Sequence, residues 1–373
     1  MKIGINCFPT VGGSGIVATQ LAIELAKKGH DIHLISYDTP FLLRTYRHPN
    51  ITLDLVDIIS YPLFKDIGAP YTILAGSKLA RIAEKSDLDL LHIHYAIPAG
   101  VSAYLAKQIS GVPVAITAHG SDIHTLGVDP AYNPVISHVF DNIDGLSTVS
   151  EYMKSEMEEK FSHNKEIEVL YNPIDIEKYK RIDTKLCDFR IQHEKNFVHV
   201  SNFRPVKNAP FIVEAFAKVV KEHPDTGLIM VGEGPERKKC EEIASKLGIR
   251  DNVTFQGVRV SITPIYNCAS ALLSASTNES FGLTIAESMS CEIPVIAPKV
   301  GGIPEVIDHE VNGYVYELGN SESLVNYMLE LLDDPQRVRQ MGAKGRQKVI
   351  DKFEAGKIAD KYIKWYNKVL ENL

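Results

Sequence analysis

Short apolar segments alternate with amphipathic helical patterns over nearly the whole chain, and this alternation constrains the fold more than any other feature of the sequence. Strands that are joined by helices pair in parallel, so the pattern predicts parallel sheets with helices on both faces. The expected strands of the first half are residues 2–7, 31–36, 51–56, 88–94, 112–117, 145–150 and 167–171. Those of the second half are residues 196–201, 226–232, 252–257, 269–276, 293–298 and 313–318.

The chain has 373 residues, which is long enough for two domains, and Asn172-Pro173 interrupts the alternation near its middle. We expect a Rossmann-like domain over residues 1–172 and a second over residues 173–354, with a terminal helix of about 355–373 returning to the first. Two doubly wound sheets in tandem give an α/β fold with a central cleft. Ligands of such sheets bind at the carboxyl ends of the strands.

Charge and cysteine content exclude several classes of function. A net charge of −7 without long runs of Lys or Arg argues against nucleic acid and against stable membrane association. No apolar run approaches the roughly 18 residues of a membrane span, and the opening "MKIGINCF" favours a strand over a signal peptide. The five cysteines lie far apart and form no CxxC pair, which argues against zinc and disulfides. We therefore expect a cytoplasmic protein, and a homo-oligomer is compatible with the sequence.

A glycine cluster opens the helix that follows the first strand. Residues 13–18, Gly-Ser-Gly-Ile-Val-Ala, fit the dinucleotide fingerprint, and Asp38 lies near the end of the second strand, so an NAD-dependent oxidoreductase is one hypothesis. The insertion "FPTV" before Gly12 argues against it, because the longer loop leaves room for a smaller ligand, and Asp38 also suits a simple turn. Two alternatives to a dinucleotide site remain. The helix start forms a site for another anion, or the glycines only permit the turn and Ser14 caps the helix.

Charged residues follow two strands of the second half. Arg204 and Lys207 in "HVSNFRPVKN" suit a diphosphate, although a solvated surface pair is the alternative. Glu279 and Glu287 in "NESFGLTIAES" suit sugar hydroxyls, and the alternative is a helix cap and a surface residue. Between them, a helix start offers further backbone N–H groups to an anion or a hydroxyl. These are the groups of Phe281, Gly282 and Leu283.

The order of these motifs resembles a known family. E-x-F-G-x-x-x-x-E, preceded by "NFRPVKN" and "GEGP" and followed by "GGIPEVI", is similar to the retaining glycosyltransferases of family 4, which have the GT-B fold. Within the family, "LDLLHIHYAIP" and "AHGSDIHTLG" resemble the branch that transfers N-acetylglucosamine from UDP-N-acetylglucosamine to L-malate in bacillithiol biosynthesis. The resemblance covers essentially the whole chain.

The resemblance implies roles for the donor side. Arg204 and Lys207 would neutralise the diphosphate, Glu279 and His119 would contact the donor sugar, and Glu287 would hold the ribose hydroxyls. The backbone at residues 281–283 would support the sugar hydroxyls, and Gly13 would face the edge of the donor. The implied reaction retains configuration, because the leaving β-phosphate takes the acceptor's proton on the face that the acceptor attacks. It needs no enzyme nucleophile, no metal and no cofactor beyond the UDP-sugar substrate.

The acceptor side is expected on the first domain. The helix start at Gly13, Ser14 and Gly15 would take a malate carboxylate. Hydroxyls of Tyr95 and Thr117 would donate to malate, and Arg44 is a candidate cation with a solvated loop residue as its alternative.

One departure from the family pattern concerns the acceptor. Related enzymes often carry an arginine in the helix after the HG[ST]D stretch, whereas this chain offers Ser137 and His138 there. Three alternatives therefore remain beside the malate transferase. They are a family 4 enzyme acting on a polysaccharide or glycolipid, a non-catalytic sugar-nucleotide sensor, and the NAD-dependent oxidoreductase. The pair His92 and His94 in "HIHY" has no nearby acidic or cysteine partner in sequence, so a metal site is not expected there.

Overall fold

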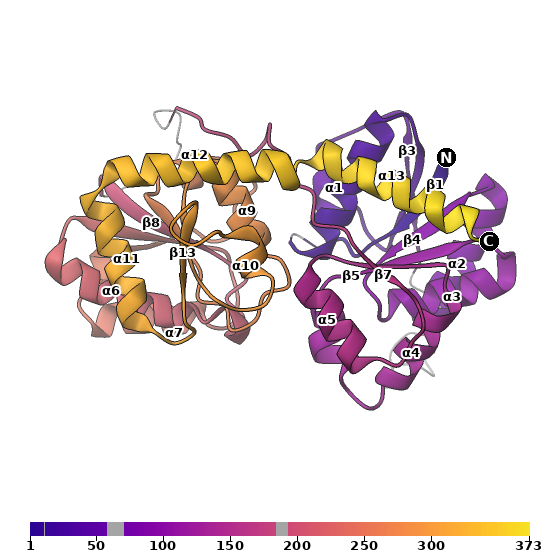
Figure 1. Cartoon of the computed structure of the whole chain (residues 1–373), viewed down its shortest axis with the longest axis horizontal. Coiled ribbons are helices and arrows are strands. Elements are labelled where there is room, and N and C mark those ends of the chain that lie inside the picture. The colour runs from indigo at the N-terminus through magenta and orange to yellow at the C-terminus, as the bar shows by residue number, and fades with distance from the viewer. Residues whose placement is uncertain (11, 58–70, 184–192) are drawn as a thin grey trace. The chain divides into compact units, whose positions relative to one another are not determined.

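The computed structural model describes residues 1–10, 12–57, 71–183 and 193–373. The chain divides into two units, one formed by Met1–Pro173 with Ala355–Leu373 and the other by Ile174–Glu354. Figure 1 shows a sheet flanked by helices in each unit.

The first unit holds a seven-stranded parallel sheet in the order β3-β2-β1-β4-β5-β6-β7. Its strands are β1 (Lys2–Asn6), β2 (Asp31–Ser36), β3 (Ile51–Leu55), β4 (Leu90–His94), β5 (Val114–Ala118), β6 (Gly145–Thr148) and β7 (Ile167–Val169). Its helices are α1 (Ser14–Lys27), α2 (Tyr71–Ser86), α3 (Ala99–Ser110), α4 (Asn133–Asn142), α5 (Glu151–Lys160) and α13 (Ala355–Glu371).

The second unit holds a six-stranded parallel sheet in the order β10-β9-β8-β11-β12-β13. Its strands are β8 (Lys195–Val200), β9 (Thr226–Val231), β10 (Val253–Phe255), β11 (Ala271–Leu273), β12 (Val295–Pro298) and β13 (Gly313–Tyr316). Its helices are α6 (Ala209–Glu222), α7 (Arg237–Lys246), α8 (Thr263–Asn267), α9 (Leu283–Ser290), α10 (Ile303–Val306), α11 (Ser321–Asp333) and α12 (Pro335–Lys352).

Both sheets therefore confirm the α/β, doubly wound fold that the sequence predicts. In each of them the strand order reverses once, between β1 and β4 in the first sheet and between β8 and β11 in the second. Open parallel sheets bind ligands beside such a reversal, outside the carboxyl ends of the strands. The loops after β1, β4, β8 and β11 are thus the places where the fold favours a site.

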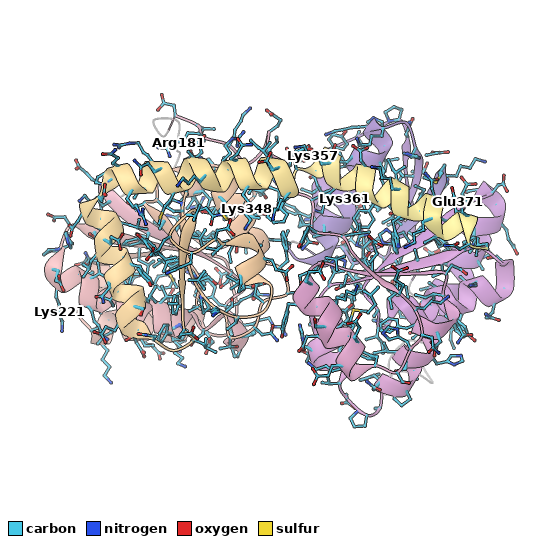
Figure 2. All side chains as sticks on the ribbon, in the orientation of Figure 1. Arg181, Lys221, Lys348, Lys357, Lys361 and Glu371 are labelled. Carbon is cyan, nitrogen blue, oxygen red and sulfur yellow. The ribbon has the colours of Figure 1, made fainter. Side chains whose placement is uncertain are left out.

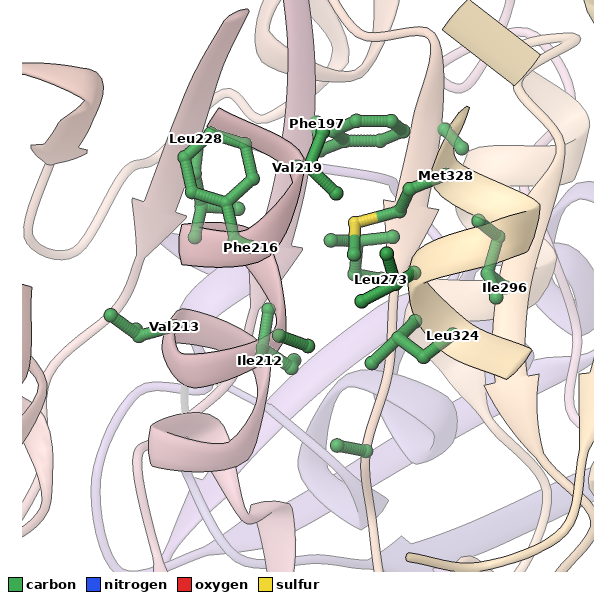
Figure 3. Packing of buried hydrophobic residues seen from close by; sticks show 14 of the residues in the cluster. Phe197, Ile212, Val213, Phe216, Val219, Leu228, Leu273, Ile296, Leu324 and Met328 are labelled. Carbon is green, nitrogen blue, oxygen red and sulfur yellow. The ribbon is translucent and has the colours of Figure 1, made fainter. Parts of the chain in front are cut away.

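Apolar residues that are buried on both faces explain why the predicted strands form. Every residue of β9 is buried, as expected for a strand that is covered on both sides. In the second unit, Phe197 of β8, Phe216 of α6 and Met328 of α11 pack into one core (Figure 3). Figure 3 shows helix and strand side chains meeting there.

Helix α13 belongs to the first unit although it ends the chain. Its apolar side, including Ile358, Tyr362 and Trp365, lies in the same core as β1 and α1. Its other side carries exposed charges such as Lys357 and Lys361 (Figure 2). This amphipathic pattern explains why the last helix packs on a sheet whose strands lie far away in sequence.

Candidate functional site

The glycine loop after β1 leads directly into α1. Gly13 has φ +62°, a conformation that glycine adopts readily, and α1 begins at Ser14 without a side-chain cap. The hydroxyl of Thr10 donates to the Gly12 carbonyl at 2.7 Å. A Cβ on Gly15 would lie 2.4 Å from the Phe8 carbonyl oxygen, so only glycine permits this close approach. Ser14 is therefore the first helical residue and not the cap, and the first N–H groups of α1 lack intrahelical acceptors.

Asp38 is exposed, and its carboxylate accepts from the backbone N–H of Thr39 at 2.7 Å. The side chain thus stabilises the local turn before Pro40, as an aspartate often does. This is the simple turn that the sequence offered as the alternative to ribose recognition.

Asp122 joins the loops after β4 and β5. Its buried carboxylate accepts from the N–H of Ala96 at 2.8 Å, of Gly120 at 2.7 Å and of His119 at 3.1 Å. Burial raises the pKa of this carboxyl, and the backbone donors oppose the shift. Sequence reasoning did not single out Asp122, although it is the last residue of "HGSD". These hydrogen bonds hold the His119 backbone against the loop that carries Tyr95.

Three histidines cluster below these loops. His94 Nδ1 and His119 Nε2 are 2.9 Å apart, and the His92 and His94 ring centroids are 4.2 Å apart. Burial lowers the pKa of His92 and of His119 to about 3, and that of His94 well below its usual value. All three imidazoles are therefore neutral near pH 7.

Two of the expected acceptor hydroxyls differ in position. The Tyr95 hydroxyl, in the loop after β4, is hydrogen-bonded to Ser121 Oγ after β5. Thr117 is fully buried within β5, where its hydroxyl bonds His92 Nε2 and Ser147 Oγ, each at 2.7 Å. The Thr117 hydroxyl is thus engaged in the interior of the sheet and is not available to a ligand at its edge.

The remaining acceptor candidates lie on the surface of the first unit. Arg44 is exposed at the end of a 3₁₀ turn, Phe41–Arg44, after β2. His138 on α4 is hydrogen-bonded to the Tyr104 hydroxyl at 3.2 Å. Among the described residues, no hydrogen bond or ion pair joins Arg44 or His138 to the glycine loop.

The basic loop, residues 201–208, connects β8 to α6. Phe203 and Asn208 both have positive φ, and the Phe203 side chain is fully buried, which anchors the loop. Arg204 is exposed, whereas Lys207 Nζ lies 2.6 Å from Glu279 Oε2, with both side chains about one-fifth exposed (24% and 20%). The cation of one loop and the carboxylate of the loop after β11 thus meet beside the strand-order reversal.

His199 supports the basic loop from within β8. Its Nδ1 bonds the Leu273 carbonyl at 2.9 Å and its Nε2 bonds Ser201 Oγ at 2.8 Å. Ser201 Oγ in turn accepts from the Phe203 N–H at 3.1 Å. Burial lowers the pKa of His199 to about 4, so the ring is neutral near pH 7. Sequence reasoning missed His199, because its partner Leu273 lies on another strand.

Close backbone contacts explain the glycines of "GEGP" and "GGIPEVI". A Cβ on Gly232 would lie 1.8 Å from the Ser201 carbonyl oxygen, and one on Gly301 would lie 2.0 Å from the Glu279 carbonyl oxygen. The N–H of Gly302 donates to that same Glu279 carbonyl at 2.8 Å. These glycines therefore bring the loops after β9 and β12 against the basic loop and Glu279.

Glu279 is not a helix cap and Glu287 is not a surface residue, which were the alternatives to sugar binding. Gly282, with φ +94°, precedes α9, and no side chain caps that helix, so Glu279 is not its cap. Glu287 is half-buried on α9 and accepts from the Tyr266 hydroxyl at 3.0 Å. Burial raises the pKa of Glu287, while hydrogen bonds from Tyr179 and Tyr266 oppose the shift. The Glu287 carboxylate is therefore fixed by tyrosine hydroxyls and is not a solvated surface group.

Within the described ranges, no group of three or more His, Cys, Asp and Glu side chains is arranged to hold a metal ion. No helix in the part of the chain that the structure describes is long and apolar enough to cross a membrane.

Comparison with known proteins decides the family. The model described as "Glycosyltransferase Family 4" matches residues 11–178, and "Glycosyl transferases group 1" matches residues 188–348. The chain is 40% identical to N-acetyl-alpha-D-glucosaminyl L-malate synthase of Bacillus anthracis, over 100% of this chain and 98% of that protein. This chain belongs to the family 4 glycosyltransferases. Membership overturns the NAD-dependent oxidoreductase hypothesis, because the glycine fingerprint lies inside the glycosyltransferase match.

Three further comparisons concern one sequence relative and two solved structures. The chain is 28% identical to alpha-monoglucosyldiacylglycerol synthase of Streptococcus pneumoniae, over 85% of this chain and 75% of that protein. Among solved structures, sucrose-phosphate synthase of Thermosynechococcus elongatus matches with a TM-score of 0.84 at 20% identity, covering 100% of both chains. Anabaena HepE in complex with UDP-glucose matches with a TM-score of 0.82 at 20% identity, again over 100% of both. These likenesses confirm the GT-B fold of this glycosyltransferase.

Proposed function

We propose that this glycosyltransferase transfers N-acetylglucosamine from UDP-N-acetylglucosamine to the hydroxyl of L-malate, as the first step of bacillithiol biosynthesis. The full-length 40% identity to the malate synthase of Bacillus anthracis carries the proposal. The assignment fits a chain whose two strand-order reversals both carry loops suited to anions. We place this reaction in the cytoplasm.

The second unit binds the donor. Arg204 and Lys207 neutralise the diphosphate, since a guanidinium grips two oxygens and an ammonium adds a point charge. Glu279, held beside Lys207, contacts the sugar, and the start of α9 at residues 281–283 offers backbone N–H groups to its hydroxyls. Glu287 accepts from the ribose hydroxyls, and its two tyrosine donors keep the carboxylate oriented for this contact.

The first unit binds the acceptor. The uncapped start of α1 at Gly13, Ser14 and Gly15 takes one malate carboxylate, because its N–H groups and helix dipole favour an anion. Tyr95, fixed by its bond to Ser121, donates its hydroxyl. Arg44 is the further cation on this unit.

Catalysis rests on positioning and on stabilising the departing diphosphate. The β-phosphate oxygen accepts the proton of the malate hydroxyl as the bond from the anomeric carbon to that phosphate breaks. The malate oxygen bonds to the same face, so configuration is retained. His119, which is neutral, contacts the donor sugar near the reacting carbon.

A glycolipid acceptor is the second candidate, because the chain also matches a diacylglycerol glycosyltransferase at 28% identity. The much higher identity to the malate enzyme favours the small acceptor. A sugar-nucleotide sensor without activity would bind UDP-N-acetylglucosamine and release nothing.

UDP release tests these possibilities in one assay. Each reaction contains the protein, UDP-N-acetylglucosamine and one acceptor. The acceptors are L-malate, D-malate, succinate and diacylglycerol in mixed micelles. We expect UDP release with L-malate, and none with succinate, which has both carboxylates but no hydroxyl. Release with diacylglycerol alone would assign the glycolipid function, and donor binding without any release would assign a sensor.

A further inference from the structure

The two histidines His94 and His119 lie side by side on neighbouring strands. His94 ends β4, and Thr117 of β5 is its register partner, so His119 lies just beyond at the carboxyl end of β5. His94 Nδ1 and His119 Nε2 are 2.9 Å apart, and the ring planes are inclined by 30°. The backbone of His119 is fixed separately by Asp122. The hydrogen bond to His94 therefore determines the orientation of the His119 ring.

One proton lies between the two nitrogens. Burial lowers the pKa of both rings, so each carries a single N–H near pH 7. Either His94 donates from Nδ1 and His119 accepts at Nε2, or the roles are reversed. The two arrangements differ in what they leave at the far nitrogen of each ring.

The surroundings of His94 distinguish the arrangements. His94 is fully buried, and its Nε2 has no hydrogen-bond partner among the described residues. If His119 were the donor, His94 would carry its proton on Nε2 and bury an unpaired N–H. Unpaired buried N–H groups are rarer than under-satisfied acceptors. The arrangement with a proton on His94 Nδ1 avoids that group, and the proton of His119 then lies on its own Nδ1.

We propose that His94 is a positioning residue that holds His119 as its Nδ1–H tautomer, so that His119 presents an N–H donor to an oxygen of the donor sugar or diphosphate. No hydrogen bond from a described residue engages His119 Nδ1, whereas Nε2 is occupied by His94. The identity of the oxygen rests on the function proposed above. The tautomer itself is a property of the protein alone.

The neighbouring His92 supports His94 without sharing this role. Both ring nitrogens of His92 are engaged, Nδ1 with the Tyr366 hydroxyl and Nε2 with Thr117, each at 2.7 Å. Its ring packs on that of His94. His92 thus fixes the position of the His94 ring, and the hydrogen bond to His119 comes from His94 alone.

Nuclear magnetic resonance of protein with ¹⁵N-labelled histidine reads the tautomer directly, because protonated and bare ring nitrogens resonate far apart. The His119 signals are assigned by their loss in His119→Gln. We expect His119 protonated at Nδ1 and bare at Nε2 in the wild type at pH 7. Protonation at Nε2 would overturn the proposal. This experiment uses no substrate, so it stands even if the malate assay fails.

Two variants test the effect on transfer. His94→Asn retains an amide N–H near the position of Nδ1, whereas His94→Leu removes the donor. We expect His94→Leu to lower kcat roughly tenfold, which corresponds to the net contribution of one hydrogen bond, and His94→Asn to recover most of it. UDP affinity should stay within about twofold in both, because the basic loop of the second unit binds the phosphates.

The UDP measurement also separates misfolding from mispositioning. A variant that binds UDP and keeps the wild-type melting temperature but loses kcat has lost a positioning contact. Equal kcat in His94→Leu and wild type would contradict the proposal. So would equal losses in the Leu and Asn variants when both are folded.

Discussion

The ion pair between Lys207 and Glu279 joins two residues to which we assign different parts of the donor in the proposed function. We propose the diphosphate as the partner of the ammonium and the sugar as that of the carboxylate, and Lys207 Nζ and Glu279 Oε2 lie 2.6 Å apart in the second unit. Each side chain is partly exposed, so the pair itself adds little to folding stability. In the proposed function its contribution is to catalysis, because it would hold two groups where charge develops as the diphosphate leaves.

Replacing Lys207 by alanine tests this role. We expect Lys207→Ala to reduce kcat/KM by an amount equivalent to roughly 3 kcal/mol, as for the loss of a preorganised donor to developing charge. Steady-state UDP release measures it. Lys221→Ala is the matched control, because Lys221 is an exposed lysine at the far end of α6 (Figure 2). Similar rates for the two variants would remove Lys207 from the catalytic set.

For single residues, the sequence predicted the charged candidates of the site better than the residues that hold the loops in place through hydrogen bonds. Arg204, Lys207, Glu279 and Glu287 could be singled out as candidates because each lies in a loop or helix after a recognisable strand and carries a charge. Asp122, His94 and His199 act through hydrogen bonds to other loops or strands, such as that from His199 to Leu273. Sequence periodicity carries no information about such partners. Thr117 shows the converse error, since its place near a strand end concealed a hydroxyl that is committed to the interior.

Among the elements, the loops after the strands at the two strand-order reversals carry most of the candidate site residues. The strands were predictable because buried parallel strands are continuous apolar runs. Their ends were not, since residues 269–276 were expected where β11 is Ala271–Leu273. The hydrogen bonds of the ladder, and not the apolar run, determine where the strand ends. The glycine loop illustrates the same limit, because its fingerprint matched a dinucleotide although the element serves a glycosyltransferase.

Gly15→Ala tests whether the glycine loop belongs to the acceptor. The new methyl group would meet the Phe8 carbonyl oxygen, so the loop must shift away from the start of α1. We expect the KM for malate to rise roughly tenfold, as when about one charge-assisted hydrogen bond is lost, with unchanged UDP affinity by calorimetry. Gly29→Ala is the control at the other end of α1, because its Cβ would meet open space, so the strain of its φ of +88° should lower stability without changing the KM for malate. An equal loss of UDP affinity in Gly15→Ala would mean that the glycine loop binds the nucleotide and not the acceptor.

The whole molecule repeats one architecture twice. Each unit is a doubly wound parallel sheet with a single reversal, and the terminal helix α13 completes the first unit. The alternation of strands and helices and the turn at Asn172-Pro173 were sufficient to predict two such sheets. The family and the resemblance to malate transferases followed from motifs in order, whereas the residues proposed to bind the acceptor, backbone N–H groups and a few hydroxyls, carry no such motif. Only the product can decide the acceptor.

The anomeric configuration of the product tests the central claim most directly. The purified protein is incubated with UDP-N-acetylglucosamine, whose sugar is α-linked, and with L-malate, and the product is examined by proton nuclear magnetic resonance. The account predicts an α-linked N-acetylglucosamine on the malate hydroxyl, with one UDP released per glycoside formed. A β-linked product, or free N-acetylglucosamine with malate unchanged, would contradict it.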